Sequence, residues 1–359
     1  MTTTLLSGDN CNFCDRAEIK SKENTNIKTK QTVFYNNPPT IIGSYSIVGQ
    51  KEGDGPVGKY FDKTIIDAKI GEKTFENAEI RMLTDAINGA ISAAGIRKND
   101  VDLMISGDLL NQVTSSNYVA RSFDSPYLGV YSACSTMTEA LNLASTFIDG
   151  GKFDTIACST ASHFATAERQ YRYPLEYGCQ RPPYSQWTVT GAACSILSKS
   201  GNGPKITAGV IGKVIDYGTN DLNNMGAAMA PAAMNTMAAM FKETNTLPSD
   251  FDLIITGDLG KLGSDILRKL MREQGYNLGK EYIDCGHLIF DGSQMCYQGG
   301  SGAACSGTVF NSFVLNRLNS GMYKNVAYFA TGALMSTQSC YQGETIPCIS
   351  HAVIVEGQK

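Results

Sequence analysis

Residues 102–111 read DLMISGDLLN, and residues 252–261 read DLIITGDLGK, which repeats the same order of acidic, apolar and glycine positions at an offset of 150. Two further blocks recur in the same order: ACS at 133–135 returns at 304–306, and GGKFDTIACSTAS at 150–162 resembles SGMYKNVAYFATGA at 320–333. Repetition in a fixed order over such lengths indicates two copies of one structural unit.

Each copy alternates short apolar strands with helical segments, which predicts an α/β layered architecture. In the first copy a long helix is predicted over about 75–94, followed by an acidic turn and a strand at 103–105. In the second copy Pro231 suits the first position of a helix that runs to about Lys242, ahead of a strand at 253–255. The two copies therefore have matching elements.

The repeat divides the chain into an N-terminal half at 32–204 and a C-terminal half at 205–359. Residues 1–31 are polar and charged with little apolar clustering, so we expect a flexible tail. Cys11 and Cys14 in this tail form CNFC, which fits half a zinc site, a redox pair or neither. The sequence has no second pair at zinc-site spacing, which favours a plain tail.

The composition argues against several classes of protein. Lys and Arg number 30 and Asp and Glu 34, a net charge of −4, so the basic excess typical of nucleic-acid binding is missing. Eleven cysteines at irregular spacings in 359 residues do not resemble the disulfide framework of a small secreted domain. We expect reduced thiols, an intracellular location and no nucleic-acid partner.

The sequence also gives little indication of a signal peptide or a membrane-spanning segment. Its start, MTTTLLSGDN, lacks the charged leader and apolar run of a signal peptide. The uncharged stretch at 223–241 contains asparagines and Pro231, and falls short of the ~20 apolar residues that a membrane span needs. Any membrane association is expected to be peripheral. The methionines of this stretch are expected to pack in the core rather than to line a ligand surface.

The stretch 127–144, YLGVYSACSTMTEALNLA, predicts a strand that runs through small residues directly into a helix. Cys134 then lies in the first turn of the helix, where unpaired backbone N–H groups and the helix dipole favour an anion. The thiol pKa is expected below its ordinary ~8.5. A free cysteine can instead be a small buried apolar residue, but the strand-to-helix context favours a nucleophile.

These features resemble the thiolase superfamily, and especially the initiating β-ketoacyl synthases. The resemblance rests on the duplicated halves, YSACST at 131–136 and QGGSGAACSG at 298–307, and it covers about 32–357. It implies two similar halves, each with a mixed five-stranded sheet, in a five-layered αβαβα sandwich. Members of the superfamily usually dimerise, so a homodimer is expected.

A narrower resemblance, to the stage V sporulation protein AD family, rests on several long motifs in the correct order. These are DGPVGKYFDKT at 54–64, SGDLLNQVTSSNYVARSF at 106–123, ATAERQYRYPLEYGCQRPP at 165–183, TVTGA at 188–192, MGAAMAPAA at 225–233 and GGSGAACS at 299–306. This resemblance implies a protein that binds dipicolinic acid, alone or as its calcium chelate, and helps to move it into the developing spore. It also implies other stage V sporulation A membrane proteins as partners, and a peripheral position on the spore inner membrane.

The catalytic residues of the superfamily are only partly matched. Cys134 corresponds to the nucleophile, but Gly257 stands where the synthases have a His, and Gly300 where they have an Asn. Each missing acid or base typically costs ~10²–10⁴ in rate. The resemblance therefore implies a catalytically silent scaffold with no catalytic residue, no cofactor and no metal site of its own. Because the sequence has no acidic calcium loop, calcium would arrive on the ligand.

We expect the ligand to be bound by Cys134, by Asp258 in the glycine-containing segment 257–260, and by Gly300 and Ser301 in the glycine-rich turn 299–302. His163 follows a predicted strand and is expected to face the same pocket. Arg169 and Arg172 lie beside Tyr171 and Tyr173, and arginine can bind a carboxylate bidentately while tyrosine stacks on a flat ring. The alternative is that ERQYR at 168–172 is a solvated loop of ion pairs.

Two other functions remain open at this stage. One is an acyltransferase that uses Cys134 as its nucleophile and His163 as an unconventional base. The other is an architectural subunit with a vestigial pocket.

Overall fold

The computed structural model describes residues 30–171, 175 and 181–358. Residues Gln31–Lys359 form one compact unit. The predicted tail, with Cys11 and Cys14, lies almost entirely outside the described residues. Gln31, which the prediction included in that tail, is buried, and its backbone N–H donates to the Glu243 carboxylate at 3.0 Å.

Five strands of the N-terminal half lie side by side in the order β2-β8-β6-β4-β5. Their bounds are β2 (Thr40–Gly49), β4 (Leu103–Gly107), β5 (Tyr127–Gly129), β6 (Thr155–Ser162) and β8 (Gly191–Ser198). Strand β4 is parallel to β5 and β6, whereas β8 is antiparallel to β6 and β2. Ranked by chain order, the strands read 1-5-4-2-3 across the sheet.

Five strands of the C-terminal half have the order β9-β14-β13-β10-β11, which is again 1-5-4-2-3 by chain order. Their bounds are β9 (Lys205–Val210), β10 (Leu253–Thr256), β11 (Tyr282–Asp284), β13 (Asn325–Ala333) and β14 (Cys348–Glu356). The directions also repeat, because β10 is parallel to β11 and β13 while β14 is antiparallel to β13 and β9. The two sets join where Thr40 of β2 pairs with Lys205 of β9.

Shorter strands pair at the edges of these two sets. Strand β1 (Thr32–Phe34) pairs with β9, and β3 (Lys63–Ile65) pairs with β2. Strand β7 (Trp187–Thr188) pairs with β12 (Gly300–Ser301), which brings one segment of each half together. This last pair matters for the site described below.

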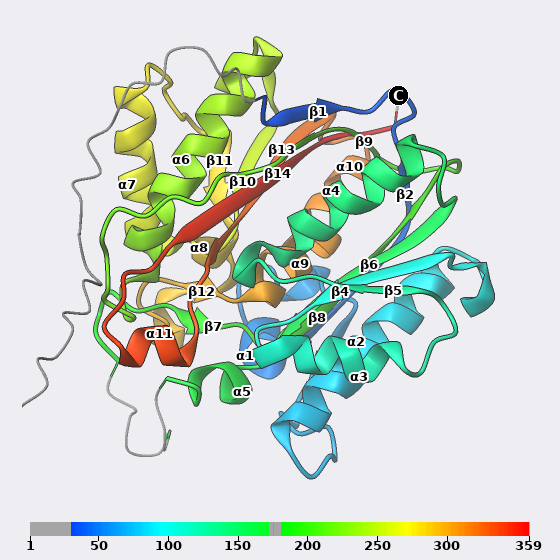
Figure 1. Cartoon of the computed structure of the whole chain (residues 1–359), viewed down its shortest axis with the longest axis horizontal. Helices are drawn as coiled ribbons and strands as arrows, with labels where there is room; N and C mark the ends of the chain where they lie inside the picture. The colour runs from blue at the N-terminus through cyan, green and yellow to red at the C-terminus, as the bar shows by residue number, and fades with distance from the viewer. Residues whose placement is uncertain (1–29, 172–174, 176–180, 359) are drawn as a thin grey trace, which may run out of the picture. The chain divides into compact units, whose positions relative to one another are not determined.

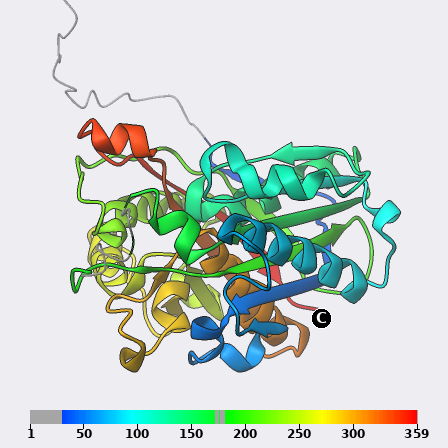
Figure 2. The ribbon, with the colours of Figure 1, turned by 90° about the horizontal axis from the view of Figure 1, so that it is seen from below.

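Helices form three layers around the strands (Figures 1 and 2). The bounds of the layer helices are α2 (Phe75–Ala93), α3 (Thr114–Ala120), α4 (Thr136–Asp149), α6 (Met225–Thr244), α7 (Gly260–Glu273), α9 (Ala303–Val309) and α10 (Leu315–Asn319). Helices α2 and α3 cover the N-terminal strands, α6 and α7 cover the C-terminal strands, and α4 contacts both β6 and β14 between them. The predicted five-layered αβαβα sandwich is confirmed.

Four short helices complete the unit: α1 (Gln50–Gly53), α5 (Phe164–Glu168), α8 (Cys285–Ile289) and α11 (Thr337–Tyr341). The largest apolar core lies around the central helix layer and draws on both halves. Within it, the buried rings of Phe310 and Tyr328 stack with centroids 4.4 Å apart. Burying this surface is the main free energy that holds the halves together.

Helix α2 confirms the helix predicted over about 75–94. It begins after Thr74, whose hydroxyl accepts a hydrogen bond from the backbone N–H of Asn77 at 3.2 Å. One apolar face then faces the sheet, with buried side chains at Ala78, Met82, Ala86 and Ala90. This four-residue spacing is the ordinary pattern of a helix that packs on one side.

Helix α6 corrects the prediction that Pro231 begins a helix. The helix starts at Met225, six residues earlier, and Pro231 lies buried in its interior. The lost backbone hydrogen bond is tolerated because the first turns are buried and pack closely: a Cβ at Gly226 would lie 2.3 Å from the carbonyl oxygen of Leu259. Within the described residues none of the helices, α6 included, has the length and apolarity to cross a membrane.

Candidate functional site

Cys134 lies at an abrupt turn between β5 and α4. Ala133 has φ +52°, a left-handed value that residues with a side chain seldom adopt, and a single 3-10 turn at Ala133–Ser135 precedes α4. From the other half, a Cβ at Gly332 of β13 would lie 1.9 Å from the carbonyl oxygen of Ser132. Only glycine allows this approach, so both halves fix the position of Cys134.

The C-terminal half also brings a hydroxyl group to the thiol. In the β7–β12 pair, Gly300 lies beside Trp187 and Ser301 beside Thr188. The Ser301 hydroxyl oxygen lies 3.7 Å from the Sγ of Cys134. The structure therefore places Ser301 against the Cys134 thiol.

Asp258 is a strained and unsatisfied residue close to this turn. Its φ is +76° and its side chain is fully buried, and within the described residues neither carboxyl oxygen has a hydrogen bond of ordinary geometry. Burial, and then the charge of Asp284, raise its pKa well above the usual range, although the Cys305 thiol and the Gly302 amide oppose the shift. A neutral, protonated carboxyl is the form that such an environment favours.

Asp284 holds the neighbouring backbone in place. Its carboxylate accepts hydrogen bonds from the backbone N–H groups of Leu259, Gly260 and His287 at 2.8–3.1 Å, and from the Thr256 hydroxyl at 2.8 Å. Burial nevertheless raises the pKa of Asp284 to about 6. The turn that carries Asp258 is thus fastened by a second buried acid.

The predicted low pKa of the Cys134 thiol is wrong. Cys134 is 9% exposed, and burial, followed by the charge of Asp258, raises the pKa of its thiol far above the ordinary value. Ser301 and the Gly302 amide stabilise the thiolate only in part. A helix N-terminus supplies ~0.3–2 kcal/mol to an anion, which is less than the cost of desolvating a buried thiolate.

A cavity of about 200 Å³ opens over Cys134, and we call it the Cys134 cavity. Its wall includes the rings of Tyr131 and Tyr171, the amides of Gln170, Gln186 and Asn223, and the hydroxyls of Thr188 and Ser301. Within the described residues Glu168 is the one charged side chain in this wall. The volume lies below the roughly 300–1,000 Å³ of pockets for drug-sized ligands, which favours a small molecule.

The methionines of residues 223–241 lie in two different environments. Met237 and Met240 are buried in the core, as predicted. Met225 and Met229, however, line the Cys134 cavity, where the prediction expected no ligand surface.

Sequence reasoning missed the ion pair at the edge of the cavity. The Nη2 of Arg181 lies 2.5 Å from the Oε1 of Glu168, and the two side chains are only 9% and 6% exposed. The Arg181 guanidinium also lies 4.8 Å from the ring centroid of Trp187. The signal was present: both charges belong to the quoted motif at 165–183, and Trp187 is the single tryptophan of the chain.

Arg169 and Arg172 are both predicted to bind the ligand, and the structure describes only Arg169. Arg169 forms an ion pair with Glu76 of α2, so its guanidinium is engaged outside the cavity wall. Arg172 lies outside the described residues. The alternative of a loop that makes ion pairs is correct for Arg169.

His163 does not share the cavity with Cys134. It lines a second cavity, beside Glu52 and Trp187. Its Nε2 lies 2.9 Å from the carbonyl oxygen of Ala68, and its Nδ1 accepts a hydrogen bond from the backbone N–H of Ala165. Burial lowers the pKa of His163, so a neutral ring caps α5 and has no free nitrogen for the thiol.

The backbone at Gly257 and at Gly300 leaves no room for a larger side chain. A Cβ at Gly257 would lie 2.3 Å from the Cβ of Ser306, and one at Gly300 would lie 2.8 Å from Ile289 and 3.0 Å from Val189. Real Cβ atoms essentially never approach below 3.0 Å. Gly300 and Asp258 are thus packed behind the cavity and do not line it.

No group of three or more His, Cys, Asp or Glu side chains that fits a metal ion is found in the described ranges.

Comparison with known proteins gives one family. The family model described as stage V sporulation protein AD matches residues 29–356. A curated relative, stage V sporulation protein AD of Bacillus subtilis (strain 168), is 43% identical over 327 residues, which cover 91% of this chain and 97% of the relative.

Solved structures agree on the fold. 3-Oxoacyl-[acyl-carrier-protein] synthase III from Aquifex aeolicus VF5 has a TM-score of 0.56 and 14% identity, with 89% of this chain and 99% of that chain covered. Human mitochondrial 3-ketoacyl-CoA thiolase has a TM-score of 0.55 and 12% identity, with 90% and 99% covered. At such identities the likeness shows the thiolase-like fold alone.

Proposed function

This chain belongs to the stage V sporulation protein AD family, and on that premise we propose that it is a non-catalytic subunit that binds dipicolinic acid, alone or as the calcium chelate, during spore formation. The ligand would lie in the Cys134 cavity. One observation carries the proposal: the cavity over Cys134 is open, whereas Ser306, Ile289 and Val189 leave no room for a side chain at Gly257 and Gly300, where the resemblance would place the proton-handling residues. A receptor needs only the cavity, whereas a condensing enzyme needs the cavity and both proton-handling side chains.

The cavity wall suits a flat, polar aromatic molecule. Tyr131 and Tyr171 supply rings, and Gln170, Asn223 and Ser301 supply amide and hydroxyl groups that hydrogen-bond carboxylate or carbonyl oxygens. These groups are neutral, so they orient a ligand without supplying opposite charge.

The charge of the wall favours the chelate over the free acid. Dipicolinate is a dianion at neutral pH, whereas its one-to-one calcium chelate carries no net charge. Among the described wall residues only Glu168 is charged, and its carboxylate is already paired with Arg181. Burying an unpaired dianion beside a carboxylate is costly, so calcium is expected to strengthen binding.

Calorimetric titration tests the proposal directly. The chain is titrated with dipicolinate in the presence and absence of calcium. Cys134→Ala is expected to weaken binding about tenfold, the value of one lost hydrogen bond to a charged group. Cys158→Ala is the matched control because it removes a buried thiol from β6, away from the cavity. Absence of saturable binding by the unaltered chain would refute the proposal.

The acyltransferase is the second candidate, favoured by one observation: Cys134 keeps a strained turn next to an open cavity. It needs a thioester on Cys134 after incubation with acyl-CoA, which intact-mass spectrometry detects. The engaged nitrogens of His163 and the raised thiol pKa predict an unmodified mass. A purely architectural subunit instead predicts that cavity variants still support dipicolinate accumulation in spores.

The assembly is proposed on the same premise. The chain would act peripherally on the spore inner membrane, through other stage V sporulation A membrane proteins, and would form a homodimer. Sedimentation of the purified chain tests the homodimer. Fractionation of spores that lack those partners tests the attachment, which predicts release of the chain from the membrane fraction.

A further inference from the structure

A second cavity lies across α5 and β7 from the first. It measures about 690 Å³, within the roughly 300–1,000 Å³ typical of ligand pockets. Thr188 and Glu168 face the Cys134 cavity, whereas Trp187 and Phe164 line the second one. We call it the Glu52 cavity after the acid in its wall.

Glu52 is a buried carboxyl with spare hydrogen-bonding capacity. It is 1% exposed, and its Oε1 accepts a hydrogen bond from the backbone N–H of Thr190 at 3.0 Å. Within the described residues no other residue donates a hydrogen bond to this side chain or forms an ion pair with it. Gly49 makes room for it, because a Cβ there would lie 2.7 Å from the Oε2 of Glu52.

Neighbouring cations do not neutralise Glu52. The ammonium of Lys51 donates to the carbonyl oxygen of Gln294 at 2.8 Å and lies 4.5 Å from the ring centroid of Trp187. His163 is neutral and uses both ring nitrogens within the protein. Asp54, on the exposed side of the cavity, adds a second acid. A buried acid without a cationic partner is costly, as its pKa of about 7 reflects.

Apart from Lys51, His163 and the uncharged polar residues Gln50, Thr190 and Gln294, the remaining wall is apolar and aromatic. Phe164 stacks on Trp187 with ring centroids 4.0 Å apart, and Phe75 lies 5.1 Å from the His163 ring. Ile65 adds an aliphatic surface. A largely apolar wall around a buried acid is the arrangement that selects a ligand with an apolar body and a positive end.

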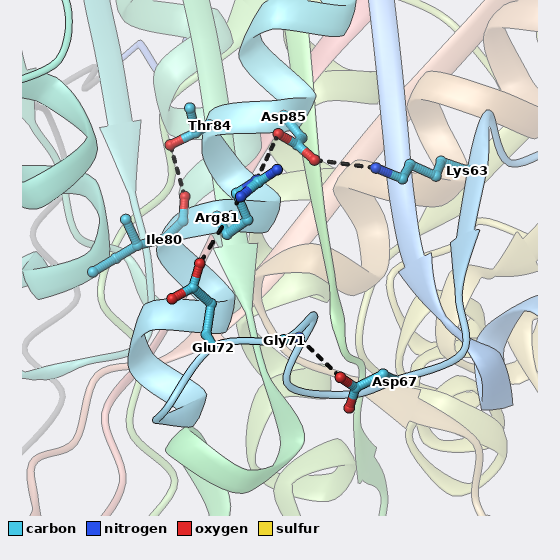
Figure 3. A network of polar contacts seen from close by, with 8 residues as sticks. All are labelled: Lys63, Asp67, Gly71, Glu72, Ile80, Arg81, Thr84 and Asp85. Atoms are coloured by element: carbon cyan, nitrogen blue, oxygen red, sulfur yellow. Dashed lines mark hydrogen bonds and ion pairs between the residues drawn. The ribbon is translucent and has the colours of Figure 1, made fainter.

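The wall formed by residues 63–75 is tied to the rest of the fold. Figure 3 shows the Asp67 carboxylate accepting from the Gly71 backbone N–H, and Arg81 of α2 lying between Glu72 and Asp85. Asp85 also pairs with Lys63 of β3 at 3.1 Å. These contacts fix the segment that carries Ile65 and Phe75, so the cavity is formed before a ligand arrives.

We propose that the Glu52 cavity binds an organic cation, an alkyl- or arylalkylammonium, whose positive end pairs with Glu52 and whose apolar body packs on Phe75, Phe164 and Ile65. The ammonium would donate to the free lone pairs of the carboxylate. This site is separate from the Cys134 cavity and does not depend on the ligand proposed there.

Phenethylamine is a suitable probe, and 2-phenylethanol is its uncharged counterpart. Calorimetry of the full chain is expected to show saturable binding of the amine and at least about tenfold weaker binding of the alcohol, because the alcohol cannot form the ion pair. Glu52→Gln is expected to weaken amine binding by a similar factor. Glu79→Gln, which changes another buried acid outside this cavity, is the matched control and is expected to bind the amine normally.

Equal binding of amine and alcohol, equal binding by Glu52→Gln, or no saturable binding by the unaltered chain would each overturn the proposal. If Glu52→Gln does not fold, a crystal of the unaltered chain soaked with 4-bromophenethylamine decides the question. The anomalous signal of bromine is expected against Phe75 and Phe164, with the nitrogen within hydrogen-bond distance of Glu52. Bromine elsewhere, or no bound probe, would contradict it.

Discussion

Asp108 and Asp258 occupy corresponding positions of the repeat, each after a strand and a glycine, yet the fold treats them differently. Asp108 accepts hydrogen bonds from the backbone N–H groups of Leu110 at 2.9 Å and Ser116 at 2.7 Å. Asp258 accepts no bond of ordinary geometry from the described residues and has φ +76°. One sequence motif thus fastens a loop in the first half and leaves a strained, unsatisfied acid near Cys134 in the second.

The difference shows where the duplicated fold has become specialised. Satisfied acids such as Asp108 stabilise structure, whereas strain and unpaired polar groups in native proteins concentrate at functional positions. The C-terminal copy therefore supplies the unusual turn and Ser301, while the N-terminal copy supplies Cys134. Four measurements test this difference between the two halves.

The largest effect is expected at the paired glycines. A Cβ at Gly107 would lie 2.1 Å from the carbonyl oxygen of Val130, whereas one at Gly257 meets the Ser306 side chain at 2.3 Å. We expect Gly107→Ala to lower the free energy of unfolding by about 3 kcal/mol and Gly257→Ala by about 2 kcal/mol, because the new Cβ at Gly107 clashes at closer range and with two neighbours, Val130 and Thr136. Urea unfolding measures both. Ser306→Gly should rescue only Gly257→Ala, and rescue of both would contradict the steric account.

The next effect is the dependence of stability on pH. Burial, then the charge of Asp108, raise the pKa of Glu79 from 4.5 to about 8. The folded state therefore holds a proton that the unfolded state releases above about pH 4.5, and stability falls as pH rises towards 8. We expect a loss on the order of 2 kcal/mol between pH 6 and 8.5, visible as a lower Tm.

Variants of single buried acids identify the group whose titration causes this pH dependence. Glu79→Gln should flatten the Tm profile above pH 6, and Glu52→Gln should flatten it less because the pKa of Glu52 is raised only to about 7. Asp284→Asn, in the other half, should leave the profile above pH 7 unchanged since its pKa is about 6. A profile that keeps its slope in Glu79→Gln would place the titrating group elsewhere.

The third measurement compares the two aspartates themselves. Asp108→Asn loses one acceptor for a backbone N–H and should lower the free energy of unfolding by about 1.5 kcal/mol. Asp258→Asn should change it by less than about 0.5 kcal/mol or raise it, because a buried acid without partners is removed. Chemical denaturation at pH 7 measures both. The comparison fails if Asp258→Asn is the more damaging change.

The smallest effect is expected on the surface of α2. Arg81 makes exposed ion pairs with Glu72 at 3.9 Å and Asp85 at 3.3 Å. Arg81→Ala should lower the free energy of unfolding by no more than about 0.5 kcal/mol, and less in high salt. Thermal melts at two salt concentrations measure it. Phenethylamine binding in this variant also reports whether the wall of the Glu52 cavity needs the contact.

Predictions from sequence succeeded where a local pattern has one structural outcome. The repeat at 102–111 and 252–261, the four-residue apolar spacing of α2 and the strand-to-helix turn at Cys134 each depend on neighbouring residues in the chain. The prediction for Pro231 was wrong because the preference of proline for the first helical position describes an isolated helix end. In the structure, buried contacts between α6 and α7 stabilise the turns before Pro231, so the helix begins at Met225.

Periodicity and ordered motifs were enough to predict the duplicated α/β fold and the family from the amino-acid sequence. The tertiary structure alone decided the high pKa of the Cys134 thiol, the separation of His163 from it, the pairing of Arg181 with Glu168 and the isolation of Glu52. Burial and charge depend on which segments meet after folding, such as Ser301 with Cys134, 167 residues apart in the chain, and Thr190 with Glu52, 138 residues apart.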